Sequence, residues 1–435
     1  MLSIKVVFLL ICLKSTCYGD FTIPKVSLEA YEPAGFRASI PADSDTQLFA
    51  FHGKVNEHIS RTEPGDFSGD VKIKSEDRFT YYNANLKLKE GDIIHYWYFV
   101  QNNFLGYRKD AQNWTVRELR PVPGTGCKAS IMKLSDRTSV CKDAIVLEDN
   151  FATSLDEAKW TLEQYMPAVP DYEFVFYKKD KDVTFIKNDQ LCIKPRLRED
   201  TKQLLTMGSI GDELADGCTK PGLCENGTYL IRNPVISGRL ESKTSFSYGD
   251  FEVKARVPSG DWIFPEIYLE DPQRRRILIA YTRGNKHLTG DAGDDLGNSL
   301  LFGGPVRQHN EPARSINLKS YAHNAPLSES SHTYRLRWTS NLIELFFDGN
   351  RYGEVGTEPG FTGSNPGKFK LVLGVGVGGV NDFPDDYKSG ENVKPWRNFK
   401  RTQVRDFFSA SSTWHPTWDN ERKQLQVDYV KITAV

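Results

Sequence analysis

The segment Ser259–Asn285 reads SGDWIFPEIYLEDPQRRRILIAYTRGN and is the most informative stretch of the chain. Its second half contains the strand-like run RILIAYT, and similar runs lie on both sides of it: FEVKARV, TYRLRWT, LIELFFDG, FKLVLGVGVG and LQVDYVKITAV. Many of these runs alternate apolar and polar residues, as half-buried antiparallel strands do. No series of amphipathic helices accompanies them. The region 145–435 therefore predicts a large β-sandwich or jelly roll.

A second β-rich region, residues 20–118, comes before it. Short runs such as GFRASI, TQLFAFHG and DIIHYWYFVQ are separated by turn-rich pieces such as PADSD and EPGDFSGD. Several short strands with regular turns predict a small antiparallel β-sandwich. The stretch LRPVPGTG at 119–126 is typical of a linker, and we expect residues 119–144 to join two domains of an all-β protein.

The overall composition excludes two classes of protein. The chain has 435 residues, 56 basic and 57 acidic side chains, a net charge of −1 and 12% aromatic residues. Disordered chains have few aromatic residues and a large net charge, so this chain should be folded. Nucleic-acid-binding domains are usually strongly basic, so we expect no nucleic-acid partner.

The N-terminal residues 1–19, MLSIKVVFLLICLKSTCYG, are typical of a secretory signal peptide. Lys5 precedes an apolar run that is too short to span a membrane, and small residues follow it. No later segment is apolar for long enough to cross a bilayer. We therefore expect a secreted, extracellular protein without a transmembrane segment. Glycosylation sequons at Asn113 and Asn226 are consistent with export.

Five cysteines follow the signal peptide, and an oxidising compartment favours their pairing. Their short spacings predict the disulfides Cys127–Cys141 and Cys218–Cys224. Cys192 lies in the apolar stretch QLCIKP and should be a buried free thiol. Zinc sites need CxxC or His-rich spacing, which the sequence lacks, so no metal or other cofactor is expected.

Gly374–Gly379 reads GVGVGG and contains a GxGxxG match. A dinucleotide site needs a helix directly after this motif, but the loop-like VNDFPDD follows. These glycines are better explained as strand positions that allow another backbone or a ligand to come close. The sequence has neither an HExxH spacing nor a GxSxG nucleophile elbow.

The segment 259–285 and the preceding GRLESKTSFSYGDFEVKARVPSGDW resemble the laminarinase-type β-1,3-glucanase family. Further matching pieces are LEDNF, PWRN, WHPTW and QVDYV. The resemblance covers residues 145–435 and implies a concanavalin-like β-jelly-roll domain. Family members carry an ExDxxE motif, whose two Glu side chains perform retaining hydrolysis with carboxyl groups about 5–5.5 Å apart.

Two alignments of this motif are possible. In the first, Glu266 and Glu270 are the catalytic pair and Tyr268 takes the place of the Asp. Residues i, i+2 and i+4 of a strand share a face, so these side chains could point into one cleft. In the second, the motif falls on Arg276, Leu278 and Tyr281.

We favour the second alignment because it keeps both flanking anchors without a gap. Trp262–Leu269 then matches the family's WPAIWxL segment, and Thr282–Asn285 matches the residues after the catalytic strand. Arginine stays protonated and cannot act as a nucleophile, leucine cannot hydrogen-bond, and tyrosine, with a pKa near 10, is a poor acid/base group. The resemblance then implies a catalytically inactive domain.

A cleft of this kind could still hold a glycan, because sugars stack on aromatic rings. The candidate residues of the cleft are Trp262, Tyr268, Arg283 and Asn285, and Tyr281 adds a further ring. Each of these aromatic side chains could equally belong to the core.

The N-terminal region resembles the glucan-binding domain of β-1,3-glucan recognition proteins, also called Gram-negative bacteria-binding proteins. The matching pieces are FRASIPADSDTQLFAFHGKVNEHI, LKLKEGDIIHYWYFV and GYRKDAQNWTV. The resemblance implies an immunoglobulin-like β-sandwich followed by an inactive glucanase-like domain. Ala42 stands where the family usually has Asp, and Phe79 stands where many members have Trp. The candidate glucan-binding residues are Asp43, Asp45, Phe79, Tyr81 and Arg108.

The resemblance implies a secreted pattern-recognition receptor that binds microbial β-1,3-glucan and triggers an innate-immune serine-protease cascade. Its expected partners are the glucan, other copies of itself on the polymer, and a modular serine protease zymogen. Other microbial glycans or lipopolysaccharide are further possible ligands. Two alternatives remain open: an active endo-β-1,3-glucanase that uses Glu266 and Glu270, and a protein-binding adaptor whose glycan sites are vestigial.

Overall fold

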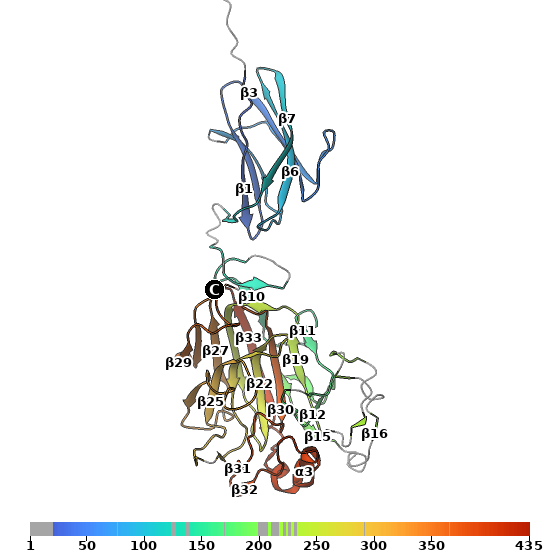
Figure 1. Ribbon diagram of the computed structural model, residues 1–435, viewed down its shortest axis with the longest axis vertical. Helices are drawn as coiled ribbons and strands as arrows, with labels where there is room; N and C mark the ends of the chain where they lie inside the picture. The colour runs from blue at the N-terminus through green and yellow to red at the C-terminus, as the bar shows by residue number, and fades with distance from the viewer. Residues whose placement is uncertain are drawn as a thin grey trace, which may run out of the picture. The chain divides into compact units, whose positions relative to one another are not determined.

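The chain forms two compact units, Met1–Cys127 and Lys128–Val435, in the computed structural model (Figure 1). The structure describes residues 21–75, 77–122, 128–135, 140–168, 170–198, 208–209, 217–220, 223–224, 228–229, 233–290, 292–364 and 366–435. Strands dominate both units, which confirms the expected all-β fold class. Within the described residues, no helix is long and apolar enough to cross a membrane. The predicted signal peptide, Cys127 and Asn226 lie outside the described residues.

The first unit is a sandwich of two four-stranded sheets, with strand orders β5-β2-β1-β8 and β4-β3-β6-β7. The strands are β1 (Ser27–Glu32), β2 (Phe36–Pro41), β3 (Thr46–Val55), β4 (Phe67–Val71), β5 (Arg78–Asn83), β6 (Ile93–Asn102), β7 (Leu105–Thr115) and β8 (Arg120–Pro121). Strand β8 pairs with β1 in parallel, so the start of the predicted linker belongs to this unit's sheet.

Alternation of side chains along β6 shows how the sequence selects this fold. Ile94, Tyr96, Tyr98 and Val100 are buried, whereas the residues between them are only partly covered. This period of two is the one expected for a strand with one face on the core.

The second unit contains two large sheets, with strand orders β13-β14-β33-β21-β27-β28-β29 and β11-β19-β30-β22-β23-β25-β26; β10 also pairs with β33. The first sheet comprises β10 (Ile145–Asp149), β13 (Thr184–Lys187), β14 (Gln190–Ile193), β21 (Gly249–Arg256), β27 (His332–Trp338), β28 (Ile343–Phe347), β29 (Asn350–Val355) and β33 (Leu425–Thr433). The second comprises β11 (Trp160–Leu162), β19 (Arg239–Ser242), β22 (Ile263–Glu270), β23 (Arg276–Tyr281), β25 (Leu300–Val306), β26 (Lys319–Ala322) and β30 (Lys370–Val377). One apolar core joins them, as expected for a jelly roll.

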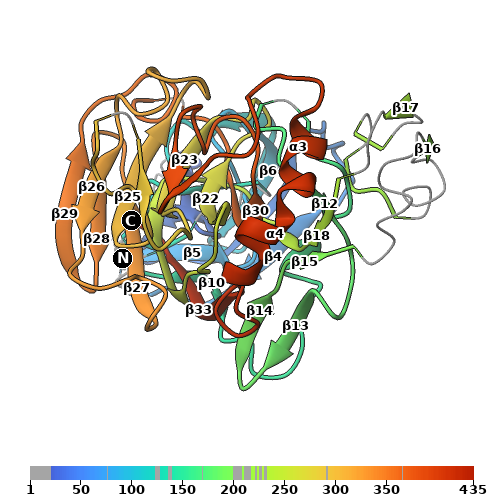
Figure 2. The same cartoon turned by 90° about the horizontal axis from the view of Figure 1, so that it is seen from below.

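Short elements surround these sheets. They are β9 (Lys133–Leu134), β12 (Val175–Tyr177), β15 (Arg196–Leu197), β16 (Gly208–Ser209), β17 (Thr228–Tyr229), β18 (Val235–Ser237), β20 (Phe246–Ser247), β24 (Leu288–Thr289), β31 (Lys388–Ser389), β32 (Asn392–Val393), α3 (Gln403–Ser409), α4 (Ser411–Trp414) and the 3₁₀ turn η1 (His415–Thr417). The helices α3 and α4 are labelled in Figure 2. The Phe407 side chain of α3 packs on Phe174 and Trp396.

Strand β22 is buried along its whole length, although it carries two glutamates. Ile267 and Leu269 point into the apolar core between the sheets. Glu266 and Glu270 lie on the opposite face, and they are only 1% and 4% exposed. A strand buried on both faces needs partners for its polar side chains, because an unpaired buried charge is strongly unfavourable.

A β-bulge interrupts the pairing of β23 with its neighbours. The register shifts between Ile267 and Tyr268 against β22, and between Leu278 and Tyr281 against β25. The extra residue turns the strand so that positions separated by two and then three residues share a face. Arg276, Leu278 and Tyr281 thus point to the same side.

Gly374 and Gly376 of β30 make room for large side chains from neighbouring strands. A Cβ at Gly374 would collide with the Glu266 carboxylate, and one at Gly376 would collide with the Phe264 ring. The GxGxxG match therefore serves close side-chain packing within a sheet.

The cysteines of the second unit include both disulfide-bonded and free side chains. Cys218 and Cys224 form a disulfide, and Cys192 is free and buried. Cys141 is also disulfide-bonded.

Candidate functional site

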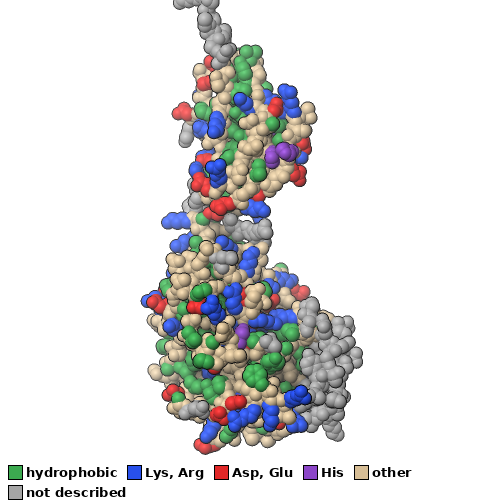
Figure 3. Space-filling view, in the orientation of Figure 1, with side chains coloured by type: hydrophobic (Ala, Val, Ile, Leu, Met, Phe, Trp, Pro, Cys, Tyr) green, Lys and Arg blue, Asp and Glu red, His purple; other side chains and the backbone are tan. Residues whose placement is uncertain are grey.

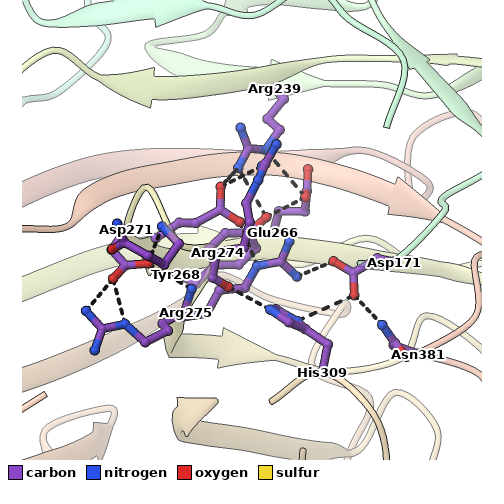
Figure 4. A network of polar contacts seen from close by, with 12 residues as sticks. Asp171, Arg239, Glu266, Tyr268, Asp271, Arg274, Arg275, His309 and Asn381 are labelled. Atoms are coloured by element: carbon purple, nitrogen blue, oxygen red, sulfur yellow. Dashed lines mark hydrogen bonds and ion pairs between the residues drawn. The ribbon is translucent and has the colours of Figure 1, made fainter. Parts of the chain in front are cut away.

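The side chains that would form a glucanase active site meet on one face of the seven-stranded sheet, opposite Ile267 and Leu269. Strand β22 contributes Glu266, Tyr268 and Glu270, and the bulged strand β23 contributes Arg276, Leu278 and Tyr281. Figure 4 labels two of these residues, Glu266 and Tyr268, together with their neighbours Arg239 and Arg274. All six are at most 6% exposed, so they form a buried network rather than an open cleft.

Arg276 is the centre of this network. Its Nε donates a 2.8 Å hydrogen bond to Glu270 Oε1, and its Nη1 lies 2.7 Å from Asp171 Oδ2. The guanidinium group also lies 4.5 Å from the centre of the Tyr268 ring. Two carboxylates therefore balance the charge of this buried arginine, and the Tyr268 ring packs against its guanidinium group.

Glu270 is surrounded by three arginines. Arg239 and Arg274 approach its Oε2 at 2.8 and 3.1 Å, and Arg276 approaches Oε1. Burial alone would raise the pKa of Glu270, but these guanidinium groups hold the pKa well below its ordinary value. The carboxylate stays charged and fully paired.

Glu266 behaves in the opposite way. Burial raises the pKa of its carboxyl group, against the effect of Arg239, whose Nε lies 3.6 Å from Oε1. The Tyr268 hydroxyl donates a 2.7 Å hydrogen bond to the same oxygen. The Arg239 guanidinium thus contacts both glutamates of β22, and it also pairs with buried Glu163.

Asp171 connects the network to distant loops. Asn381 Nδ2 donates a 3.0 Å hydrogen bond to its Oδ1, and His309 Nδ1 lies 3.8 Å from the same atom (Figure 4). Burial opposes ionisation, but Arg276 and Arg314 hold the pKa of Asp171 below its ordinary value.

Tyr281, at the other end of β23, is 5% exposed. Its hydroxyl lies 3.5 Å from the Asp382 carbonyl oxygen, which also accepts a 2.7 Å hydrogen bond from Arg283 Nε. Burial raises the pKa of the Tyr281 phenol, so the hydroxyl stays protonated near neutral pH.

The predicted cleft residues lie in the interior, so the expectation of an open sugar-binding surface must be corrected. Trp262 is 1% exposed and packs edge-to-face on Phe383 and Trp396. Asn285 is 0% exposed, and its side chain accepts a hydrogen bond from the Trp262 backbone. Tyr268 and Arg283 are 4% and 7% exposed. All four side chains are therefore nearly inaccessible to a ligand in solution.

Within the described residues, no group of three His, Cys, Asp or Glu side chains could hold a metal ion. The acidic side chains of this face are held by arginines instead.

In the first unit, the structure places the predicted acidic residues in one loop. The Asp43 carboxylate accepts hydrogen bonds from Asp45 N (3.0 Å), Thr46 Oγ1 (2.7 Å) and Asn102 Nδ2 (3.0 Å). Asp43 therefore ties the β2–β3 loop to the end of β6. The Asp45 side chain is exposed and only touches Asn103 Nδ2, at 3.5 Å.

Phe79 and Tyr81 do not join this loop, and their assignment as ligand contacts must be corrected. Phe79 is 3% exposed within the core of the sandwich, and the Tyr81 ring stacks on Phe51 at 5.7 Å. Residues i and i+2 share one face of β5, and here that face is the inner one.

Arg108 lies on the outer face of the other sheet. Its guanidinium group stacks 3.7 Å above Trp97, whose other partner is the His52 ring at 3.7 Å. Trp97 Nε1 also donates to the Glu63 carbonyl oxygen. Sequence reasoning missed His52 and Trp97, although the alternation in IIHYWYFVQ places Trp97 between buried residues.

Comparison with known families and proteins gives matches along the whole chain. The CBM39 family model, described as a carbohydrate binding domain (family 32), matches residues 22–135. Beta-1,3-glucan-binding protein 1 of Manduca sexta is 32% identical over 100% of this chain and 99% of its own. The beta-1,3-glucan-binding protein of Tenebrio molitor is 32% identical over 100% of both chains.

Gram-negative bacteria-binding protein 3 of Drosophila melanogaster is 27% identical over 95% of each chain. Among solved structures, the laminarinase from Rhodothermus marinus covers 67% of this chain and 96% of its own, at 18% identity and a TM-score of 0.44.

Proposed function

Because this chain belongs to the family of β-1,3-glucan-binding and Gram-negative bacteria-binding proteins, we propose that it is a receptor that binds β-1,3-glucan without hydrolysing it. The observation that carries this proposal is full-length similarity, at 32% identity, to proteins named for glucan binding. The match of residues 22–135 to a carbohydrate-binding family supports the first unit as the glucan-binding module.

The second unit is proposed to be a non-catalytic glucanase-like domain, with Arg276, Leu278 and Tyr281 at the positions of the catalytic motif. The bulge in β23 supports this alignment, since it brings exactly this i, i+2, i+5 set to one face. The alternative pair, Glu266 and Glu270, is buried, and Arg239 contacts both carboxyl groups. Retaining hydrolysis needs two carboxyl groups that reach the sugar, one of them as a nucleophile.

We also propose that the protein is secreted, glycosylated and active in immune recognition. The signal-like residues 1–19 and the exposed sequon residue Asn113 support secretion of a glycoprotein. The resemblance to immune sensors supports a role upstream of a modular serine protease zymogen, with self-association on the polymer. Lipopolysaccharide or other microbial glycans would be additional ligands.

The test uses the full chain with insoluble β-1,3-glucan, soluble β-1,3-glucan and cellulose as a β-1,4-linked control. We expect sedimentation with the insoluble β-1,3-glucan, none with cellulose, and no release of reducing ends. Lack of sedimentation would overturn the proposed binding function. Release of reducing ends that disappears in Glu266→Gln would show that the chain is an enzyme.

A further inference from the structure

The β6–β7 hairpin ends in an exposed aromatic side chain. Asn102 pairs with Leu105 across a two-residue turn, Asn103–Phe104. Phe104 is 83% exposed, compared with 44% for Tyr82, the other strongly exposed aromatic residue in the described part of the first unit. Nothing in the sandwich covers the Phe104 ring, so the fold does not need it there.

The backbone of this turn makes phenylalanine an unfavourable choice. Asn103 and Phe104 have φ angles of 50° and 64°. Two positive φ angles define the tight hairpin turn for which Asn-Gly is the preferred pair. A bulky side chain at positive φ is strained, and such strain is concentrated at functional sites.

Neighbouring groups hold the turn in place. The Phe104 backbone N–H donates a 2.9 Å hydrogen bond to Gln47 Oε1, and the Asn103 N–H donates a 3.0 Å bond to the Asp45 carbonyl oxygen. Asp43 fastens the same loop to Asn102. The exposed ring therefore lies beside the loop that carries Asp43 and Asp45.

The chemistry around the ring favours a neutral, hydroxyl-rich ligand. The flanking segments 43–47 and 101–105 contribute carboxylate and amide groups and contain no lysine or arginine. Carboxylates and amides accept and donate hydrogen bonds to hydroxyl groups, whereas two carboxylates without a nearby cation disfavour an anionic ligand.

We propose that Phe104 is the ring on which the first unit stacks a glucosyl residue of β-1,3-glucan, with the Asp45 carboxylate binding its hydroxyl groups. This inference rests on the proposed glucan-binding function and adds the residue that makes the apolar contact. Phe104 takes the stacking role for which Phe79 and Tyr81 are unavailable, because Phe79 is buried in the core and the partly buried Tyr81 ring stacks on Phe51.

The test compares Phe104→Gly with Phe399→Gly in the full chain. Phe399 is a matched control in the second unit: it is 69% exposed, has a φ of 60°, and its N–H donates to Gln403 Oε1 at 3.1 Å. Glycine relieves the strain at both positions, so neither variant should unfold. Thermal unfolding midpoints at or above the wild-type value would check this.

Isothermal titration with soluble β-1,3-glucan should show about three- to tenfold weaker binding for Phe104→Gly, the range expected for one aromatic contact. Phe399→Gly should bind like the wild type. Phe104→Tyr should bind like the wild type, and Phe104→Leu should be weakened to a degree similar to Phe104→Gly, because a ring face is required.

Two outcomes would overturn the inference. One is an equal loss of affinity in Phe399→Gly. The other is unchanged affinity of Phe104→Gly, and a loss of self-association in ultracentrifugation alongside it would assign Phe104 to a protein contact. If the wild-type chain itself does not bind, the proposed function fails instead, and the two failures are thereby distinguished.

Discussion

Arg276 Nε lies 2.8 Å from Glu270 Oε1, on the face of the seven-stranded sheet opposite Ile267 and Leu269. Both side chains are nearly inaccessible to solvent, at 6% and 4% exposed. Each also has further partners of opposite charge, Asp171 for the arginine and Arg239 for the glutamate. The Arg276–Glu270 pair therefore stabilises the fold of the second unit. Removing either side chain should lower the free energy of unfolding.

The first prediction concerns Arg276→Ala. This substitution leaves Glu270 and Asp171 with fewer cations in a buried site, so the free energy of unfolding should fall by about 3–5 kcal/mol. Urea denaturation of the full chain measures the change. Arg351→Ala is the matched control, because Arg351 is half exposed and pairs with Glu344 and Glu354 at the surface. Its cost should stay below about 1 kcal/mol. Equal effects would contradict a structural role for the buried network.

The second prediction concerns the pH dependence of Glu270. Because its pKa is lowered in the folded state, its stabilising contribution is complete above the ordinary value of 4.5 and is lost as the pH falls below it. Glu270→Gln should therefore be clearly less stable than wild type at pH 7, and this difference should shrink between pH 5 and pH 3. Denaturation midpoints over this range provide the measurement. A difference that stays constant with pH would show that the charge of Glu270 is not what stabilises the fold.

The third prediction separates Asp43 from Asp45. Asp43→Ala leaves the Asn102 amide, a 4% exposed residue, without its carboxylate partner. This should cost about 1–3 kcal/mol and increase hydrogen exchange at the end of β6. Asp45→Ala removes an exposed carboxylate and should change stability by less than about 0.5 kcal/mol. Both substitutions should weaken glucan binding, so a loss of binding in Asp43→Ala alone would exclude Asp45 as a contact.

The fourth prediction concerns the strand glycines. In Gly374→Ala the new Cβ would press on the Glu266 carboxylate and on Arg239 Cγ, 3.2 Å away. We expect a loss of about 1–3 kcal/mol in unfolding free energy. Gly356→Ala is the control, since a Cβ there has no atom within 4 Å. A neutral Gly374→Ala variant would mean that the network has space to adjust.

The fold was largely predictable because strand alternation is a local property of the sequence. Both β-rich regions formed sheets, and the glycines of 374–379 proved to be strand residues. Arg276, Leu278 and Tyr281 share one face of β23 because of the β-bulge. The i, i+2, i+5 spacing of the motif in the sequence already contains the extra residue of this bulge.

The details of the sites were less predictable, for three physical reasons. The alternation in β5 puts Phe79 and Tyr81 on one face, but only the tertiary structure decides that this face is the inner one. Arg276 and Glu270 also contact Asp171 and Arg239, which are distant in sequence, so the local sequence does not predict these members of the network. The sequence does not predict the tight turn at Asn103–Phe104, because phenylalanine does not favour a positive φ angle.

The buried carboxylates and arginines around β22 balance one another, and this balance limits which substitutions the second unit tolerates. A carboxylate at position 276 would face Glu270 and Asp171 with one cation fewer, so a single substitution toward a hydrolytic pair carries a penalty before it brings any activity. Every single replacement that adds a carboxylate or removes a cation on this face leaves a buried charge without a full set of partners, which is strongly unfavourable. The network therefore restricts which substitutions the second unit can accept one at a time.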